Sequence, residues 1–164
     1  VAEAAVSIQS TNESVEASNV GGWQSYDNFI MEDPRLKEVF AVQEECINQY
    51  LTDYNICRYK LSNAWLNING KGSFNWGHIH PGAQLSCCVY VQNPGNGIDL
   101  EDPRAVVSML EGFALSPENY VEYNLRPEVG DIIVFPSWLR HKVPPNMTEE
   151  PRITIASNYH VEAL

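Results

Sequence analysis

Positive charge is scarce in this sequence. Its 164 residues include 10 Lys and Arg against 21 Asp and Glu, which gives a formal net charge of -11 at pH 7. Proteins that bind nucleic acid neutralise phosphates with Lys and Arg, and basic clusters likewise attract proteins to anionic membranes. The composition therefore argues against both a nucleic-acid-binding protein and a protein that docks on a membrane.

Long apolar runs are missing as well. No stretch comes close to the ~18 consecutive apolar residues that indicate a transmembrane helix, although 44% of the residues are hydrophobic. A chain of 164 residues can bury a core without cross-links. No internal repeat or linker divides it. We expect one domain over residues 1–164, with a leader and a helix in residues 1–56 and a β core in residues 57–164.

Cysteines are few and do not form a recognisable metal or redox motif. The four are Cys46, Cys57, Cys87 and Cys88, and none belongs to a CxxC. Cys87 and Cys88 are adjacent on a predicted strand, so their side chains would point to opposite faces. We expect reduced thiols that pack as small hydrophobic groups, as in cytosolic proteins. The sequence also shows no secretory leader pattern, so we expect a cytoplasmic protein.

One helix is predicted near the start of the chain. Residues 1–20 have no strong periodicity, and we expect an edge strand there behind a loose leader. A helix is predicted from Asp33 to about Asn55, because Asp is a good N-cap and Pro34 suits the first turn. Apolar residues then recur at helical spacing: Leu36, Phe40, Ile47, Tyr50, Leu51 and Tyr54. The pattern predicts a helix that supports a sheet and carries no chemistry.

Short strands separated by turns follow Cys57. Alternating or continuous apolar patterns predict strands at residues 62–69, 74–80, 85–92, 98–101, 120–125, 132–135 and 152–158. Residues 104–116 fit either a helix or a loop. A leading helix followed by about eight short strands is typical of a mainly β, jelly-roll or cupin-like barrel.

Histidine is rare, and three of the four histidines fall in dense motifs. His78 and His80 are two residues apart on a predicted strand, so their side chains would share a face. His141 ends the motif 135–141 and would have to come from a neighbouring strand. Three ligands on one face leave coordination positions open, as an oxygen-activating iron requires. The sequence predicts a metal centre formed by His78, His80 and His141.

Other readings of these histidines stay open. The usual non-haem iron site has two histidines and one carboxylate. Asp99, Glu101 or Asp102, on the predicted strand after the glycine-rich turn, could replace His80, although their spacing matches no specific motif. The histidines could also be ordinary core or surface residues.

The predicted last strand carries a second chemical signal. Arg152 and Thr154 alternate with two isoleucines, so the two polar side chains share one face. A guanidinium that points into a barrel needs an anionic partner, and its planar fork matches a carboxylate. Tyr90, on the strand after the histidine pair, could supply a hydroxyl to the same carboxylate. A surface salt bridge for Arg152 and core packing for Tyr90 are the alternatives. The combination indicates a metal enzyme that also holds an organic anion.

Several motifs occur together over roughly residues 60 to 160: His78-Ile79-His80-Pro81-Gly82, Leu85-Ser86, Tyr90, Asp102-Pro103-Arg104, the run 130–141 and the run 152–158, with Gly22-Trp23-Gln24-Ser25 before them. In this combination the chain resembles the iron(II)/2-oxoglutarate-dependent oxygenases of phages and marine bacteria, which are related to the prolyl-4-hydroxylase-like group. The histidine pair alone would be a weak signal, but the combination is specific.

The resemblance implies a double-stranded β-helix with iron(II) at its open end. His78 matches the first iron ligand and His141 matches the distal one. The sequence departs from the wider superfamily at His80, where Asp or Glu is usual, and resembles the narrower family that has HxHP. Three neutral ligands leave the iron with one more positive charge than a carboxylate triad does, which alters metal affinity and redox behaviour.

The resemblance also implies a binding site for 2-oxoglutarate. Arg152 matches the residue that pairs with the far carboxylate of 2-oxoglutarate, and Thr154 is its companion two residues on. Tyr90 matches a tyrosine that helps to hold the same carboxylate. Asn67, on the strand before the histidine pair, is a weaker candidate for a polar contact to 2-oxoglutarate.

The predicted activity is that of a hydroxylase-type oxygenase, which couples oxidative decarboxylation of 2-oxoglutarate to succinate with oxidation of a second substrate. Two alternatives are a three-histidine cupin-type dioxygenase that needs no keto acid, and a non-catalytic jelly-roll binding or virion module. The second substrate is expected to be a peptide or a small molecule. Residues 104–117 would line its entrance or pack on the barrel as a surface loop. The resemblance places the protein in a bacterium or a virus-infected cell, and the oligomeric state is open, with a homodimer as one option.

Overall fold

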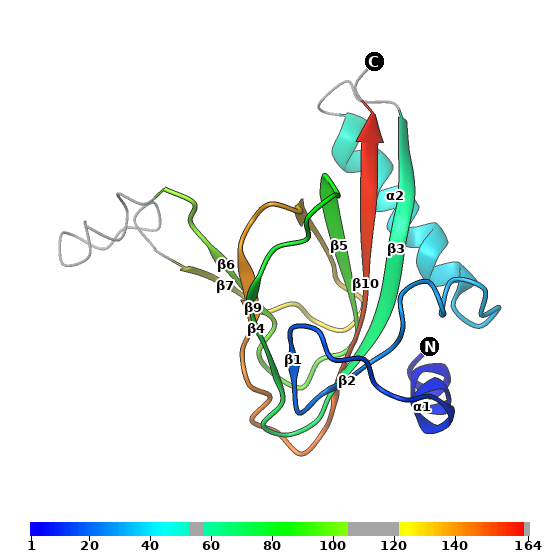
Figure 1. Cartoon of the computed structure of the whole chain (residues 1–164), viewed down its shortest axis with the longest axis vertical. Coiled ribbons are helices and arrows are strands. Elements are labelled where there is room, and N and C mark those ends of the chain that lie inside the picture. Colours follow the sequence, from blue (N-terminus) through cyan, green and yellow to red (C-terminus); the bar gives the residue numbers. More distant parts are fainter. Residues whose placement is uncertain (53–57, 105–121, 163–164) are drawn as a thin grey trace.

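Two antiparallel sheets form the body of the protein (Figure 1). The computed structural model describes residues 1–52, 58–104 and 122–162. Within these ranges, the β9 sheet has the strand order β1 (Asn19–Val20), β4 (Phe74–His78), β9 (His141–Val143), β6 (Ile98–Glu101) and β7 (Glu122–Leu125). The β10 sheet has the order β2 (Trp23–Gln24), β3 (Arg58–Asn69), β10 (Arg152–Glu162), β5 (Leu85–Gln92) and β8 (Ile132–Pro136). This arrangement confirms the predicted mainly β, double-stranded β-helix fold.

Strand β10 is the middle of its sheet and aligns the side chains that matter later. It pairs with β3 on one side and with β5 on the other. The register places Thr154 between Asn67 of β3 and Tyr90 of β5. Because side chains alternate, Thr154 and its two partners point to the face opposite to Ile153 and Ile155. One face of β10 is therefore polar and points between the sheets, as the sequence predicted.

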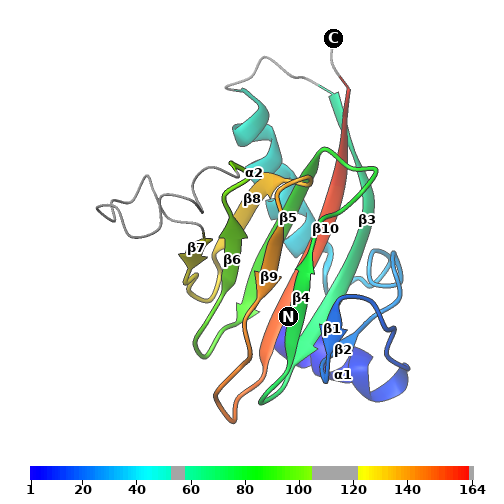
Figure 2. The same cartoon turned by 60° about the vertical axis from the view of Figure 1, so that its left-hand side comes forward.

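The other face of the β10 sheet packs under two helices, α1 (Ala2–Thr11) and α2 (Lys37–Thr52) (Figure 2). Its core includes Ile153 and Ile155, which are 1% and 0% exposed. Full burial of such a side chain stabilises a fold by roughly 1.5–3 kcal/mol. Gln43 of α2 donates from Nε2 to the carbonyl of Ile155 at 3.3 Å and accepts from the Ser157 hydroxyl at 3.0 Å. The predicted supporting role of this helix is correct.

Helix α2 begins later than predicted. The Asp33 carboxylate accepts a hydrogen bond from the backbone N–H of Arg35 at 2.9 Å, and the Asp33 carbonyl accepts from Leu36. These bonds make a turn rather than the first turn of an α-helix. The helix therefore starts at Lys37, and the predicted continuation to Asn55 passes, after Thr52, beyond the described residues.

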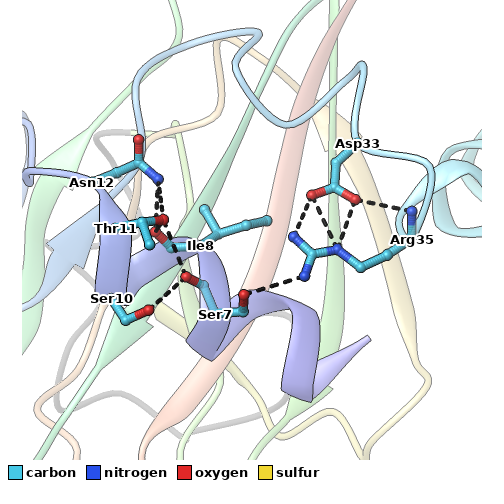
Figure 3. Close-up of polar contacts among 7 residues, drawn as sticks. All are labelled: Ser7, Ile8, Ser10, Thr11, Asn12, Asp33 and Arg35. Atoms are coloured by element: carbon cyan, nitrogen blue, oxygen red, sulfur yellow. Dashed lines mark hydrogen bonds and ion pairs between the residues drawn. The ribbon is translucent and has the colours of Figure 1, made fainter.

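The prediction of an edge strand and a loose leader for residues 1–20 was wrong for most of this segment. Residues 2–11 form helix α1, and only Asn19–Val20 pair as a strand. At the carboxyl end of α1, Asn12 Nδ2 donates to the Ile8 carbonyl at 2.8 Å (Figure 3). Arg35 Nη1 donates to Ser7 Oγ at 3.2 Å while its guanidinium pairs with Asp33 at 2.6 Å. The exposed contact between Arg35 and Ser7 joins α1 to the turn that precedes α2.

Neither helix in the described ranges is long and apolar enough to cross a lipid bilayer. Cys46, Cys87 and Cys88 carry free thiols, and Cys57 lies outside the described residues.

Candidate metal centre

Three imidazoles meet between the two sheets. His78 ends β4 and His141 begins β9, and the two residues are directly paired in the ladder. The ligand atoms of His78, His80 and His141 all lie within 4.8 Å of one another. Small rotations of the rings would bring all three within reach of one ion. Among the described residues, this is the one group of His, Cys, Asp or Glu side chains placed to hold a metal.

His80 reaches this centre by a different route from the one predicted. Strand β4 ends at His78, so the predicted strand over residues 74–80 was too long. His80 lies in the following loop, just before Pro81, which has no N–H to continue a ladder. The backbone N–H of His80 donates to the carbonyl of Ser137 at 3.0 Å. The loop after β8, rather than strand periodicity, therefore sets the position of the third imidazole.

All three rings have hydrogen-bond partners at Nδ1; among the described residues, Nε2 of His80 and His141 has none, and Nε2 of His78 faces only the Ser18 hydroxyl at 3.4 Å. His78 Nδ1 lies 2.6 Å from the Trp76 carbonyl, and His141 Nδ1 lies 2.9 Å from the Leu139 carbonyl. A carbonyl only accepts, so both rings carry their proton on Nδ1. His80 Nδ1 lies 2.8 Å from Asn158 Oδ1 and 2.8 Å from Ser86 Oγ. This is the arrangement of ligands whose Nε2 lone pair binds a metal.

Burial keeps the three rings neutral. It lowers the pKa of His141 to about 3, and the repulsion expected from protonated His78 and His80 adds to the effect. Burial, followed by the neighbouring His78, lowers the pKa of His80 to about 4. The pKa of His78 is also lowered, mainly by burial. Neutral imidazole is the form that binds metals, so protons compete little with an ion at neutral pH.

These shifts predict an acid-sensitive metal-free protein. The folded pKa of His141 lies below its unfolded value near 6.5, so the unfolded chain binds more protons as the pH falls. Stability from this group is thus complete above about pH 6.5 and is lost as the pH falls toward the folded pKa of about 3. Urea unfolding of metal-free protein should show a lower free energy of unfolding at pH 4.5 than at pH 7.0. In His141→Ala this decrease in the free energy of unfolding should be smaller by on the order of 2 kcal/mol. An equal loss in both proteins would contradict the prediction.

The three carboxylates considered as replacements for His80 point elsewhere. Leu100 of β6 faces His141 in the ladder, so Asp99 and Glu101 on either side of it project to the opposite face. Each carboxylate instead has a cationic partner: Asp99 with Lys142, Glu101 with Arg140 and Asp102 with Arg104. Within the described residues, His80 is the side chain that completes the group.

A buried arginine lies in the cavity beside the three imidazoles. Arg152 is 3% exposed and lines the same cavity as His78, His80 and His141. Its guanidinium donates to the carbonyls of Asn96 at 2.9 Å and Pro144 at 3.1 Å. No carboxylate of the described ranges forms an ion pair with it, and burial lowers its pKa. A buried cation without an anion is costly, so the cavity suits an anionic ligand.

Thr154 and its two ladder partners, Asn67 and Tyr90, offer further polar groups near Arg152. Tyr90 is 2% exposed, and burial raises the pKa of its phenol, which therefore keeps its proton. Asn67 Nδ2 lies 3.4 Å from Thr154 Oγ1. Asn67 Oδ1 is buried without a hydrogen-bond partner in the described residues, which is costly unless a ligand or water meets it. Three neutral imidazoles together with these groups fit iron(II) and a dicarboxylate in one cavity.

Sequence reasoning missed several residues of the site. Ser18, Trp65 and Asn158 line its cavities, and Ser18 Oγ lies 3.4 Å from His78 Nε2. Strand parity would have found Asn158, which shares the face of Arg152 and Thr154. Ser18 lies in a segment without pattern, and no sequence signal marks it. Beyond Arg104, the predicted entrance segment 104–117 lies outside the described residues.

Comparison with known proteins decides the family. Residues 63–158 match the family model described as "Putative 2OG-Fe(II) oxygenase". The chain belongs to this family. Its members are 2-oxoglutarate-dependent oxygenases that use iron(II), which confirms the enzyme class and the two cofactors predicted from the sequence. A comparison with curated proteins finds no match.

Solved structures of this 2OG-Fe(II) oxygenase fold are similar over nearly the whole chain. A prolyl-4-hydroxylase from Pseudomonas putida has a TM-score of 0.65 and 14% identity, and the match covers 99% of this chain and 84% of that one. A Trichoplax adhaerens prolyl hydroxylase, solved with a hypoxia inducible factor peptide fragment, has a TM-score of 0.63 and 16% identity, and the match covers 98% of this chain and 76% of that one. HygX from Streptomyces hygroscopicus, solved with nickel, 2-oxoglutarate and hygromycin B, has a TM-score of 0.62 and 13% identity, and the match covers 96% of this chain and 77% of that one. At these identities the likeness establishes the fold alone.

Proposed function

We propose that this 2OG-Fe(II) oxygenase is a hydroxylase-type enzyme in which His78, His80 and His141 hold iron(II) and Arg152 holds 2-oxoglutarate. The observation that carries this assignment is the buried guanidinium without a carboxylate, in the same cavity as three neutral imidazoles. A three-histidine dioxygenase without a keto acid would leave this arginine unexplained.

When bound, iron(II) and 2-oxoglutarate supply the oxidation chemistry, in which decarboxylation to succinate is coupled to oxidation of a second substrate by dioxygen. Nε2 of each histidine would hold the metal, while the Nδ1 hydrogen bonds keep the rings in place. Arg152 would bind the far carboxylate of 2-oxoglutarate, with Tyr90 and Thr154 as hydroxyl donors and Asn67 as a further polar contact. Apolar side chains in the cavity wall, which include Phe135 and Ile98, would limit the access of water to the bound 2-oxoglutarate.

The second substrate would enter from a separate, wider groove. This groove shares His78, His80, Ser18 and Trp65 with the inner cavity, so it opens directly onto the proposed iron. No Lys or Arg of the described residues lines it, and Asp27 is its one carboxylate. A neutral or cationic peptide or small molecule is therefore favoured over an anionic one. The peptide bound to the Trichoplax enzyme and the hygromycin B bound to HygX are examples of both classes on this fold.

Anaerobic calorimetry tests the proposed function. We expect 2-oxoglutarate to bind with micromolar affinity when iron(II) is present and much more weakly without it, because metal and Arg152 each hold one end of the molecule. Slow succinate formation without a second substrate should follow on admission of air. Failure of 2-oxoglutarate to bind the iron-loaded protein would overturn the proposal. Oxygen consumption at the same rate without 2-oxoglutarate would favour the three-histidine dioxygenase instead.

A further inference from the structure

The third imidazole is oriented differently from the other two. His78 and His141 donate Nδ1–H to main-chain carbonyls, which cannot change from acceptor to donor. Among the described residues, His80 Nδ1 faces only side chains, the Asn158 amide and the Ser86 hydroxyl, each at 2.8 Å. An amide or a hydroxyl can present either a donor or an acceptor. Something else must therefore decide which nitrogen of His80 carries the proton.

A chain of hydrogen bonds leads from His80 to a carboxylate. Asn158 Nδ2 donates to Asn63 Oδ1 at 3.0 Å, and Asn63 Nδ2 donates to Asp27 Oδ2 at 2.8 Å. Asn63 and Asn158 face each other in the β3–β10 ladder, and Asp27 lies three residues after β2. All four side chains line the open groove. The series Asp27, Asn63, Asn158 and His80 is called the relay below.

The charge at one end fixes the direction of every bond in the relay. An ionised carboxylate only accepts, so Asn63 must turn Nδ2 toward Asp27. Asn63 Oδ1 then faces Asn158 and takes its Nδ2, which leaves Asn158 Oδ1 for His80. His80 must therefore donate its Nδ1–H to that oxygen. The Ser86 hydroxyl agrees with this direction, because it donates to Asn158 Oδ1 at 2.8 Å and can accept from His80.

We propose that Asp27 is a positioning residue of the metal centre, which acts through Asn63 and Asn158 to hold the proton of His80 on Nδ1 and to keep Nε2 free for the metal. This inference rests on the proposed function of His80 as an iron ligand, and it links a carboxylate by hydrogen bonds to a ligand set that itself has no carboxylate. An anion linked by hydrogen bonds to a ligand imidazole also makes that imidazole a stronger base toward the metal.

The tautomer of His80 can be observed directly. Long-range 1H–15N correlation spectra of metal-free, histidine-labelled protein at pH 7.5 distinguish Nδ1–H from Nε2–H. We expect Nδ1–H for His80 in the wild type. In Asp27→Asn the new amide still offers Asn63 a hydrogen-bond partner, but the charge is gone. The side-chain amides of Asn63 and Asn158 can then flip, so the Nε2–H tautomer of His80 should become populated. Wild-type protein with His80 in the Nε2–H form, or an unchanged tautomer in Asp27→Asn, would overturn the proposal.

Cobalt(II) titration gives the second readout, with visible absorption as the signal. We expect Asp27→Asn to weaken cobalt(II) binding about tenfold, the lower end of the effect of an outer partner of a metal ligand. Glu32→Gln is the matched control, because it removes the same charge from an exposed side chain five residues along the chain. Equal cobalt(II) affinity of Asp27→Asn and wild type would contradict the relay.

A double variant separates the relay from a general effect on folding. In Asp27→Asn/Asn158→Asp the carboxylate moves next to His80 and can accept Nδ1–H itself. We expect this variant to restore both the Nδ1–H tautomer and wild-type cobalt(II) affinity, which a merely structural role of Asp27 would not do. His141→Ala distinguishes the two levels of the hypothesis: if it binds cobalt(II) as tightly as wild type, the three-histidine centre itself is wrong. If only Asp27→Asn has no effect, the centre stands and the relay does not.

Discussion

Arg152→Met should yield a folded protein that no longer binds 2-oxoglutarate. Arg152 is buried, faces the cavity that holds the three imidazoles and, within the described residues, donates only to two carbonyls. Removal of one partner from a buried, hydrogen-bonded charge pair costs roughly 2–5 kcal/mol, which corresponds to about 30-fold to several thousand-fold in affinity. Calorimetry with 2-oxoglutarate and cobalt(II)-loaded protein measures the change.

The same substitution should affect stability far less than affinity. The two carbonyls lose their donors, but an unpaired buried cation is removed, and the two effects oppose each other. We expect the free energy of unfolding without ligand to change by less than about 2 kcal/mol. Arg58→Met is the matched control, because Arg58 is exposed and lies at the opposite end of the β3–β10 ladder. If Arg152→Met binds 2-oxoglutarate like Arg58→Met, Arg152 does not hold the anion.

His141→Ala should abolish tight metal binding and, with it, 2-oxoglutarate turnover. His141 is 4% exposed, and the Leu139 carbonyl fixes its ring, so its truncation removes a positioned imidazole and leaves two. Loss of an outer partner already weakens metal sites by about 10–100-fold, so loss of a ligand should exceed 100-fold. Cobalt(II) titration measures the affinity, and succinate formation from 2-oxoglutarate measures the turnover.

His160→Ala is the control for that experiment. It removes the remaining histidine of the chain, which is exposed and hydrogen-bonds to Ser62 rather than to the three imidazoles. Its cobalt(II) affinity should equal that of the wild type. A His141→Ala protein that keeps full metal affinity and turnover would show that His141 is not a metal ligand.

Local sequence signals predicted the parts of the fold that depend on neighbouring residues. Strands β5 and β6 begin and end where the sequence placed them, because the turn residues 93–97 separate two clear apolar patterns. Helix α1 was missed although Ala and Glu, which favour helices, fill its first turns. Its apolar stripe is too weak for periodicity to reveal, and its contact with the turn at Asp33 depends on the tertiary structure.

The residues of the site likewise divide into those that local strand parity predicted and those that the tertiary structure places. Parity along β10 predicted that Arg152 and Thr154 share a face, and the structure agrees. Parity failed for His80, because the strand ends two residues earlier and the Ser137 carbonyl then places the loop. The relay could not be predicted at all. It needs the register that sets Asn63 opposite Asn158 and the fold of the loop that carries Asp27.

The central position of β10 has a consequence for how the protein is made. Residues 152–162 come after every other strand of their sheet in the chain, yet they lie between β3 and β5. While a ribosome is still synthesising the preceding residues, β3 and β5 have no strand between them and expose unpaired edges, which favour aggregation. Pairing across so long a sequence separation is also slow. Arg152 and Asn158 arrive only with this strand, so an interrupted chain would have neither the anion pocket nor the relay.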